Sequence, residues 1–170
     1  VFEFRIALGN AERIADFVNR PSSVSDELAT GPTRTDAEAR MFADLDPKAR
    51  AWWGEKLKGF LEMGVAGLWL DMNEPALFAA WGEPTLPASA RHALEGQGGD
   101  HRLAHNLYGL LMARASWEGF RKHAPERRPF LLTRSGHAGV QRYAWAWTGD
   151  VESTWEGLRT TLRALLGLSL

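Results

Sequence analysis

Apolar residues along the chain occur either at helical spacing or in short continuous runs. The first helical stretch begins at Asp46 and Pro47, which are typical of a helix cap and first turn, and ends at Gly64. Its apolar residues recur at i, i+4, i+7 and i+8: Trp53, Leu57, Phe60 and Leu61. The run from Val65 to Leu70 follows at once and predicts a buried strand.

The same pattern repeats toward the C-terminus. A second helix is predicted over about 101–123, then a strand over 130–133, an apolar run over 143–147, and a last helix from Ser153. The second helix has its leucines and a phenylalanine near one face: Leu103, Leu107, Leu110, Leu111 and Phe120. This order of helices and strands predicts an α/β protein with parallel strands.

Two segments lack this clarity. Residues 1–45 give no defined pattern, so the organised domain is predicted over 46–170. Residues 79–100 are rich in glycine and proline and are predicted to form a long loop. A third segment, the connection over 135–142, is too short for an ordinary crossover between parallel strands, which usually needs about a dozen residues or more. By local rules alone it predicts a hairpin.

Composition narrows the class of protein. The chain is 45% hydrophobic and 24% charged, as in ordinary globular proteins. A net charge of −1 gives no field for nucleic acid or an anionic membrane, and no apolar run reaches the roughly 20 residues of a membrane span. The absence of cysteine and of a visible signal peptide favours the cytoplasm. Because the chain begins with valine and stops within an apolar stretch, we expect a piece of a larger protein.

Two aspartates follow predicted strands. Asp71 ends the run over 65–70, and Asp150 ends the run over 143–147. Carboxyl ends of parallel strands are where α/β proteins place their chemistry. Helix capping is the alternative. Asn73 could cap a helix, but that leaves Asp71 unexplained, and a capping box from Ser153 to Glu156 leaves Asp150 outside the last helix.

Two carboxylates facing one pocket can hydrolyse a glycosidic bond, one as nucleophile and the other as proton donor. Their separation, which distinguishes retention from inversion, cannot be read from sequence. Arg134 ends the middle strand and is either an ordinary surface arginine or a donor to sugar hydroxyls. Trp69 and Trp147, at strand ends, could stack on a sugar, whereas the tryptophans on helices are predicted to lie in the core.

Other groups of residues give only weak evidence of a metal or cofactor site. His101 and His105 are four residues apart, but the segment lacks the glutamate of the zinc-protease motif. They are predicted to be solvated or to pack against a loop. No glycine-rich phosphate loop is present. Neither metal nor organic cofactor is expected, because two carboxylates and water suffice for glycosidic hydrolysis.

These motifs resemble those of a known family. The segment GLWLDMNEP, residues 67–75, resembles the nucleophile signature of family 31 glycoside hydrolases, the α-glucosidase and α-xylosidase group. Residues 105–158 resemble the family's next long stretch, with L-T-R-S, Q-R-Y-A and W-T-G-D in order and at the right spacing. The resemblance covers about 41–170.

The resemblance implies a (β/α)8 TIM barrel, with the three strands as its fourth to sixth, and a retaining mechanism on terminal α-linked sugars. Asp71 would be the nucleophile and Asp150 the general acid/base. Arg134 would bind sugar hydroxyls, with the pocket walled by Trp69, Met72 and Trp147. It also implies that residues 135–142 connect parallel strands tightly, against the local hairpin prediction.

The chain departs from the family in several places. The usual Trp-Pro-Gly segment is replaced by 29–32, Val151 follows Asp150 where Asn is usual, and residues 1–40 fit poorly. The other five barrel strands are absent. We therefore expect the catalytic-barrel fragment of an exo-acting α-glucosidase that binds α-linked oligosaccharide. It would need the remainder of its barrel, and alone it would be inactive or poorly folded. The open alternatives are α-xylosidase, α-glucosyltransferase, or an inactive carbohydrate-binding piece.

Overall fold

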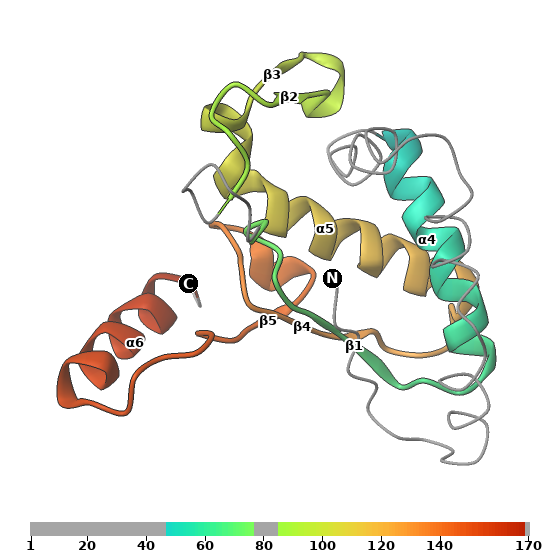
Figure 1. The fold of residues 1–170 in the computed structure, drawn as a ribbon. Helices are drawn as coiled ribbons and strands as arrows, with labels where there is room; N and C mark the ends of the chain where they lie inside the picture. Colours follow the sequence, from blue (N-terminus) through green and yellow to red (C-terminus); the bar gives the residue numbers. More distant parts are fainter. Residues whose placement is uncertain (1–46, 77–84, 169–170) are drawn as a thin grey trace, which may run out of the picture.

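A three-stranded parallel sheet carries the fold (Figure 1). The computed structural model describes residues 47–76 and 85–168, so the prediction for residues 1–45 lies outside it. The sheet has the order β1-β4-β5, and helices α4 and α5 lie together on one of its faces. Its elements are β1 (Gly67–Leu70), β4 (Phe130–Thr133), β5 (Trp145–Ala146), α4 (Pro47–Glu62) and α5 (His101–His123). The predicted α/β class with parallel strands is confirmed.

The remaining elements are short, apart from the last helix. Within the predicted loop over 79–100, the described part forms an antiparallel hairpin around a 3-10 turn. A second 3-10 turn lies between β4 and β5. These elements are β2 (Arg91–His92), η2 (Leu94–Gly96), β3 (Gly99–Asp100), η3 (Val140–Arg142) and α6 (Trp155–Leu168).

The connection from β4 to β5 joins parallel strands. Leu132 pairs with Trp145 and Thr133 with Ala146, both in parallel register. The local hairpin prediction for residues 135–142 is therefore wrong, and the tight connection implied by the family resemblance is confirmed. The physical reason is that η3 replaces a full crossover helix. Its Val140 is fully buried and joins the main core, so a single turn covers this part of the sheet.

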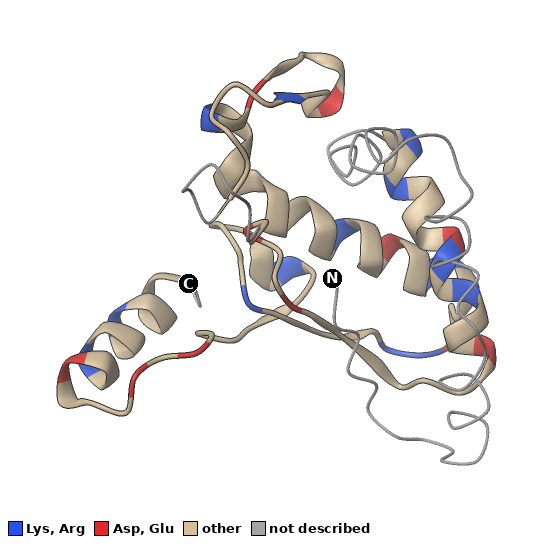
Figure 2. Ribbon diagram, viewed as in Figure 1, with Lys and Arg blue, Asp and Glu red and all other residues tan. Residues whose placement is uncertain are grey.

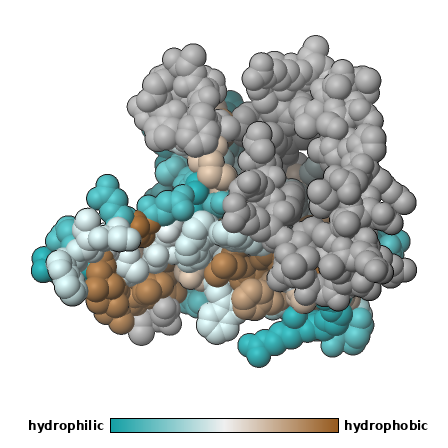
Figure 3. Space-filling view, turned by 60° about the horizontal axis from the view of Figure 1, so that its bottom comes forward, coloured by the Kyte–Doolittle hydropathy of each residue, from teal (hydrophilic) through white to brown (hydrophobic). Residues whose placement is uncertain are grey.

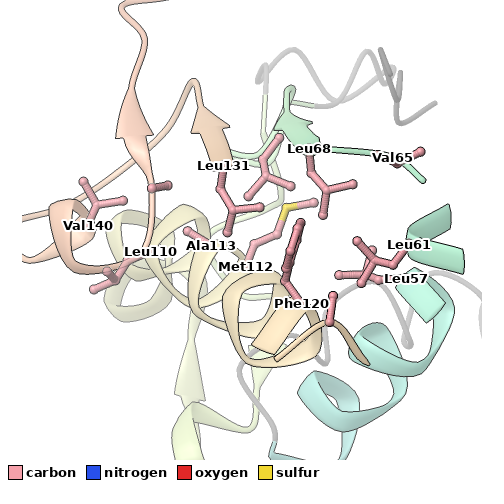
Figure 4. Close-up of a cluster of buried hydrophobic side chains, with 13 residues drawn as sticks. Leu57, Leu61, Val65, Leu68, Leu110, Met112, Ala113, Phe120, Leu131 and Val140 are labelled. Carbon is pink, nitrogen blue, oxygen red and sulfur yellow. The ribbon is translucent and has the colours of Figure 1, made fainter. Parts of the chain in front are cut away.

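The core lies between the sheet and the two helices. Figure 4 shows Leu68 and Leu131 on the strand side, facing Met112 and Phe120. Leu57 and Leu61 complete it from α4, which confirms the predicted stripe of that helix. On α5 the prediction fails for one residue, because Leu103 is 66% exposed.

Helices α4 and α5 pack closely because two glycines meet at their crossing. A Cβ atom added at Gly119 would lie 2.5 Å from the Gly54 Cα atom. Real Cβ contacts are not this short, so the backbones would have to separate. Any larger side chain here would move α5 away from the core that it shares with the sheet.

The sheet has two unlike faces. Side chains alternate along a strand, and Leu68, Leu70 and Leu131 are buried on the helix side. Trp69 and Leu132 belong to the opposite face and are only partly buried. In a barrel, that second face is the interior. Residues that continue its alternation past the strand ends, such as Asp71 and Arg134, lie on the same side.

The β2–β3 hairpin docks on the start of α5 through histidines. His92 and His101 are 5% and 3% exposed, and His92 Nε2 lies 3.0 Å from His101 Nδ1. Thr85 Oγ1 contacts His101 Nε2 at 3.1 Å, and the His105 ring packs edge-on against that of His101. The prediction that His101 packs against a loop is confirmed, whereas a solvated His101 is wrong. No group of three or more acidic or histidine side chains in the described ranges is arranged to hold a metal.

Helix α6 has an apolar stripe that the described part of the chain leaves mostly uncovered. Leu158, Leu162 and Leu166 are 49–68% exposed, and Trp155 is 85% exposed. Figure 3 shows hydrophobic side chains at the surface on the side where α6 lies. The prediction that helical tryptophans lie in the core is thus wrong for Trp155, and also for Trp52, which is 46% exposed.

Charges of both signs are interspersed along α4, α5 and α6 (Figure 2). This distribution agrees with the small net charge. None of the helices in residues 47–76 and 85–168 is long and apolar enough to cross a membrane.

The glycine crossing gives a direct test of packing. Gly119→Ala should destabilise the fold by about 3 kcal/mol, because the added methyl group meets the α4 backbone. Gly59→Ala, on α4 and with open space around the added methyl group, should stabilise by about 0.5–1 kcal/mol. Urea unfolding of both variants measures the difference. Equal effects would contradict the close crossing.

The buried histidine predicts a pH-dependent stability. Burial, with repulsion from His92 and His105, lowers the pKa of His101 from 6.5 to about 4. Above pH 6.5 both folded and unfolded states hold it neutral. As the pH falls from 6.5 to about 4, only the unfolded state takes up the proton. The free energy of unfolding therefore falls by about 1–3 kcal/mol.

His101→Gln should remove most of that pH dependence, measured by urea unfolding at several pH values. His137→Gln is the matched control, because His137 is exposed. A wild-type slope that survives His101→Gln would assign the effect to other groups.

Candidate active site

The first candidate carboxylate lies at the end of β1. Asp71 follows Leu70, and its side chain is 15% exposed. The next residue, Met72, has a φ of 58°, a left-handed conformation that is uncommon outside glycine. Its N–H donates to Asp71 Oδ1 at 2.8 Å. The turn therefore holds the carboxylate toward the sheet edge, and such backbone strain is concentrated at functional sites.

Arg134 occupies the corresponding place on β4 and contacts three carboxylates. Its N–H donates to the Leu70 carbonyl at 3.0 Å, which extends the β1–β4 ladder. Its Nη1 lies 3.1 Å from Asp71 Oδ1 and 3.7 Å from Asp150 Oδ2. Nε and Nη2 each donate to Glu74 at 2.8 Å. The structure thus brings together the two aspartates and the arginine that the sequence singled out.

The Glu74 pair is the strongest contact of Arg134. It is bidentate, a geometry that fixes the plane of the guanidinium as well as its position. The hydrogen bonds from Arg134 to Glu74 are the largest cause of a raised Arg134 pKa, with added attraction from Asp71 and Asp150. Arg134 therefore stays charged, and its Nη1 edge points to the two aspartates. It is not a surface arginine, since its side chain is 15% exposed.

Sequence reasoning did not single out Glu74 as a site residue. The signal that could have found Glu74 is Arg134 at the end of the neighbouring strand, because its positive charge lies at the same sheet edge and favours a nearby acidic side chain. Asn73 was considered as a helix cap, and that interpretation is wrong for the described residues. Its side chain instead contacts Thr133 and the backbone of Ser135 on the neighbouring strand.

The second candidate carboxylate, Asp150, follows β5 in the chain. The Trp147 N–H donates to the Thr133 carbonyl at 2.8 Å, and Gly149 turns the chain with a φ of 75°. A Cβ atom at Gly149 would lie 3.2 Å from the Arg134 side chain, so glycine suits both the turn and the close approach. Asp150 itself is 89% exposed. In the described part of the chain, nothing shields it from water.

The helix after Asp150 begins one residue later than its capping signal suggests. Thr154 Oγ1 accepts from the Gly157 N–H at 3.0 Å, which makes Thr154 the cap in place of Ser153. Asp150 still lies outside the helix, which begins at Trp155, and does not cap it.

The two tryptophans predicted to line the sugar pocket, Trp69 and Trp147, are in contact. Trp69 and Trp147 pack edge to face with ring centroids 4.9 Å apart, on the same sheet face as Asp71. The Met72 sulfur accepts from Arg134 Nη2 at 2.9 Å. All four residues predicted to contact the sugar therefore border one region, together with both aspartates.

Polar and charged side chains gathered at the carboxyl edge of a parallel α/β sheet are typical of the active-site end of an enzyme barrel. Comparison with known proteins identifies the family to which this barrel belongs. Residues 16–170 match the family model described as the Glycosyl hydrolases family 31 TIM-barrel domain. The chain belongs to glycoside hydrolase family 31 and is part of its TIM barrel.

Individual relatives agree with this assignment. Alpha-glucosidase 2 of Bacillus thermoamyloliquefaciens is 43% identical over 130 residues, which cover 76% of this chain and 16% of that protein. The alpha-glucosidase of Saccharolobus solfataricus is 37% identical over 139 residues, 71% of this chain and 20% of that protein. A crystal structure of a family 31 alpha-glucosidase from Bacteroides thetaiotaomicron superposes with a TM-score of 0.55 at 41% identity, covering 72% and 18%. The chain spans about a fifth or less of these relatives' length.

The Arg134 contacts predict a stability difference between two ion pairs. Glu74→Gln should destabilise by about 1–3 kcal/mol, because a partly buried bidentate pair loses its charge. Glu156→Gln, in the exposed pair with Arg159, should change stability by less than about 0.5 kcal/mol. Denaturant unfolding compares them, and similar values would show that Arg134 does not depend on Glu74.

Proposed function

We propose that this chain carries the catalytic carboxylates of a retaining, exo-acting α-glucosidase. One observation carries the proposal: oxygens of Asp71 and Asp150 both approach the same Arg134 nitrogen, at 3.1 and 3.7 Å. Their separation cannot exceed the sum of these distances. That limit, which applies to the two named oxygens, is compatible with the about 5–5.5 Å between the carboxyl groups of retaining enzymes, and the family resemblance adds the expectation of retention.

The proposed reaction has two steps. An Asp71 oxygen attacks the anomeric carbon and forms an ester, while the bond to the glycosidic oxygen breaks and that oxygen takes a proton from Asp150. Water then attacks the anomeric carbon, gives a proton back to Asp150, and releases Asp71 as a carboxylate. The net configuration is retained because the carbon is inverted twice.

Arg134 supports the first step electrostatically. Its Nη1 lies 3.1 Å from Asp71 Oδ1, so its positive charge faces the carboxylate that we propose as the nucleophile. Its Nη1 edge also faces the region between the aspartates, where sugar hydroxyls could accept hydrogen bonds. Trp69 and Trp147 offer apolar surface to the sugar ring on the same sheet face.

The exposure of Asp150 indicates that the proposed active site needs further segments of the barrel. Closing an active site excludes water from the reacting groups. With 89% of the Asp150 side chain exposed, this chain alone does not enclose the proposed acid. We therefore place the activity in a complete barrel, in which other segments cover Asp150 and finish the sugar pocket.

A chimera tests the proposal. Residues 41–170 would replace the matched segment of the Bacillus relative, and hydrolysis of aryl α-glucosides would be followed by NMR. Asp71→Ala should abolish turnover, and added azide should restore it as the β-glucosyl azide. Asp150→Ala should reduce the rate by about 10²–10⁴-fold on poor leaving groups, and azide should then give the α-glucosyl azide.

Glu152→Gln, two residues from Asp150 and exposed, is the matched control and should keep full activity. Release of the β anomer, or turnover that survives Asp71→Ala, would contradict the proposed mechanism. Faster turnover of aryl α-xylosides would favour an α-xylosidase with the same residues. A folded chimera that binds but never cleaves α-glucosides would favour the inactive carbohydrate-binding alternative.

A further inference from the structure

A fully buried amide connects the ends of β1 and β4. Asn73 is 0% exposed, and its Nδ2 donates to Thr133 Oγ1 at 2.8 Å. Its Oδ1 accepts from the Ser135 N–H at 3.0 Å. The Thr133 hydroxyl donates its own proton to the Ser135 carbonyl at 2.7 Å. We refer to Asn73, Thr133 and the Ser135 backbone as the amide clamp.

The clamp has a single consistent arrangement of donors and acceptors. Because the Thr133 proton goes to the Ser135 carbonyl, its oxygen is free to accept, and only an N–H donor suits it. The Ser135 N–H in turn needs an acceptor. Asparagine offers both groups in this orientation, whereas aspartate would set a carboxylate oxygen against the Thr133 oxygen. Since Thr133 is only 1% exposed, water does not compete with these bonds.

The position of the clamp gives it a role beyond stability. Thr133 and Ser135 flank Arg134, and Asn73 lies between Met72 and Glu74. One side chain therefore joins the segment that holds Asp71 and Glu74 to the segment that holds Arg134. The contacts of Arg134 with those two carboxylates are partly open to water, with Glu74 32% exposed, whereas the side chains of Asn73 and Thr133 are buried.

We propose that Asn73 and Thr133 are positioning residues that set the placement of Arg134 relative to Asp71. The consequence for catalysis rests on the proposed function, whereas the consequence for Arg134 does not. Errors of about 1 Å in such groups can cost about 10²-fold in rate. The clamp contacts no reacting atom itself, so its effect passes through Arg134 and Asp71.

Matched variants separate positioning from stability. Thr133→Val keeps the shape but removes the hydroxyl, and Thr133→Ser keeps the hydroxyl. Ser116→Ala is the control for loss of a buried hydrogen bond elsewhere, because Ser116 is 0% exposed and accepts from Trp53 Nε1 at 2.8 Å between α4 and α5. Both Thr133→Val and Ser116→Ala should lower the melting temperature.

The first readout is hydrogen exchange of the Arg134 Nε–H, followed by ¹⁵N NMR in the 170-residue chain. Thr133→Val should accelerate this exchange by about tenfold, because Arg134 is held less firmly against Glu74. Thr133→Ser and Ser116→Ala should leave it unchanged. Unchanged exchange in Thr133→Val, or equal acceleration in Ser116→Ala, would overturn the proposal.

The second readout is the kinetics of the chimera. Thr133→Val should lower kcat by about 10–100-fold with KM nearly unchanged, and Thr133→Ser should restore it. If the exchange changes as expected while every chimera is inactive, the proposed function fails and the clamp stands. If the wild-type chimera is active and Thr133→Val keeps its kcat, the positioning role fails alone.

Discussion

Three carboxylates share one cation at the carboxyl edge of the sheet. Asp71, Glu74 and Asp150 come from two loops that would repel each other without Arg134 between them. Arg134 contacts all three because its guanidinium has donors on two edges, and Glu74 occupies one edge completely. The other edge is left for the aspartates. A lysine could not divide its contacts in this way, because its donors lack a fixed plane.

This arrangement depends on how closely the layers below it pack. The parallel register places the ends of β1, β4 and β5 at one edge, and the glycine crossing of Gly54 and Gly119 keeps α5 against the sheet. The charged contacts are thereby fixed by apolar packing. Apolar packing brings the charged groups together, and the bidentate pair with Glu74 then fixes the orientation of Arg134.

Sequence patterns predicted the long elements and the positions of both aspartates after strands. Helical spacing located α4 and α5, and the switch from apolar runs to polar residues located Asp71 and Asp150. The local rule for short connections failed at residues 135–142, because it assumes that only a helix can carry a crossover. Val140 shows why, since one buried residue in a 3-10 turn covers the sheet here.

Contacts between segments distant in sequence were harder to predict. Asn73 and Glu74 have the spacing of a helix start, so their partners on β4 could not be read from local sequence. Thr154 replaced Ser153 as a cap because neighbouring residues of similar chemistry compete for one role. His101 is buried because it meets His92 across a hairpin that no periodic pattern indicated.

The segment between β1 and α5 is fixed at both of its ends. Asn73 holds its beginning against β4, and the stacked rings of His92 and His101 hold its return to α5. The entropy of closing a loop rises only slowly with its length. Insertions and substitutions between these two anchors would therefore disturb the carboxyl edge of the sheet little. In evolutionary terms, this stretch can diverge in length and sequence while the contacts of Arg134 with Asp71 and Glu74 are inherited unchanged.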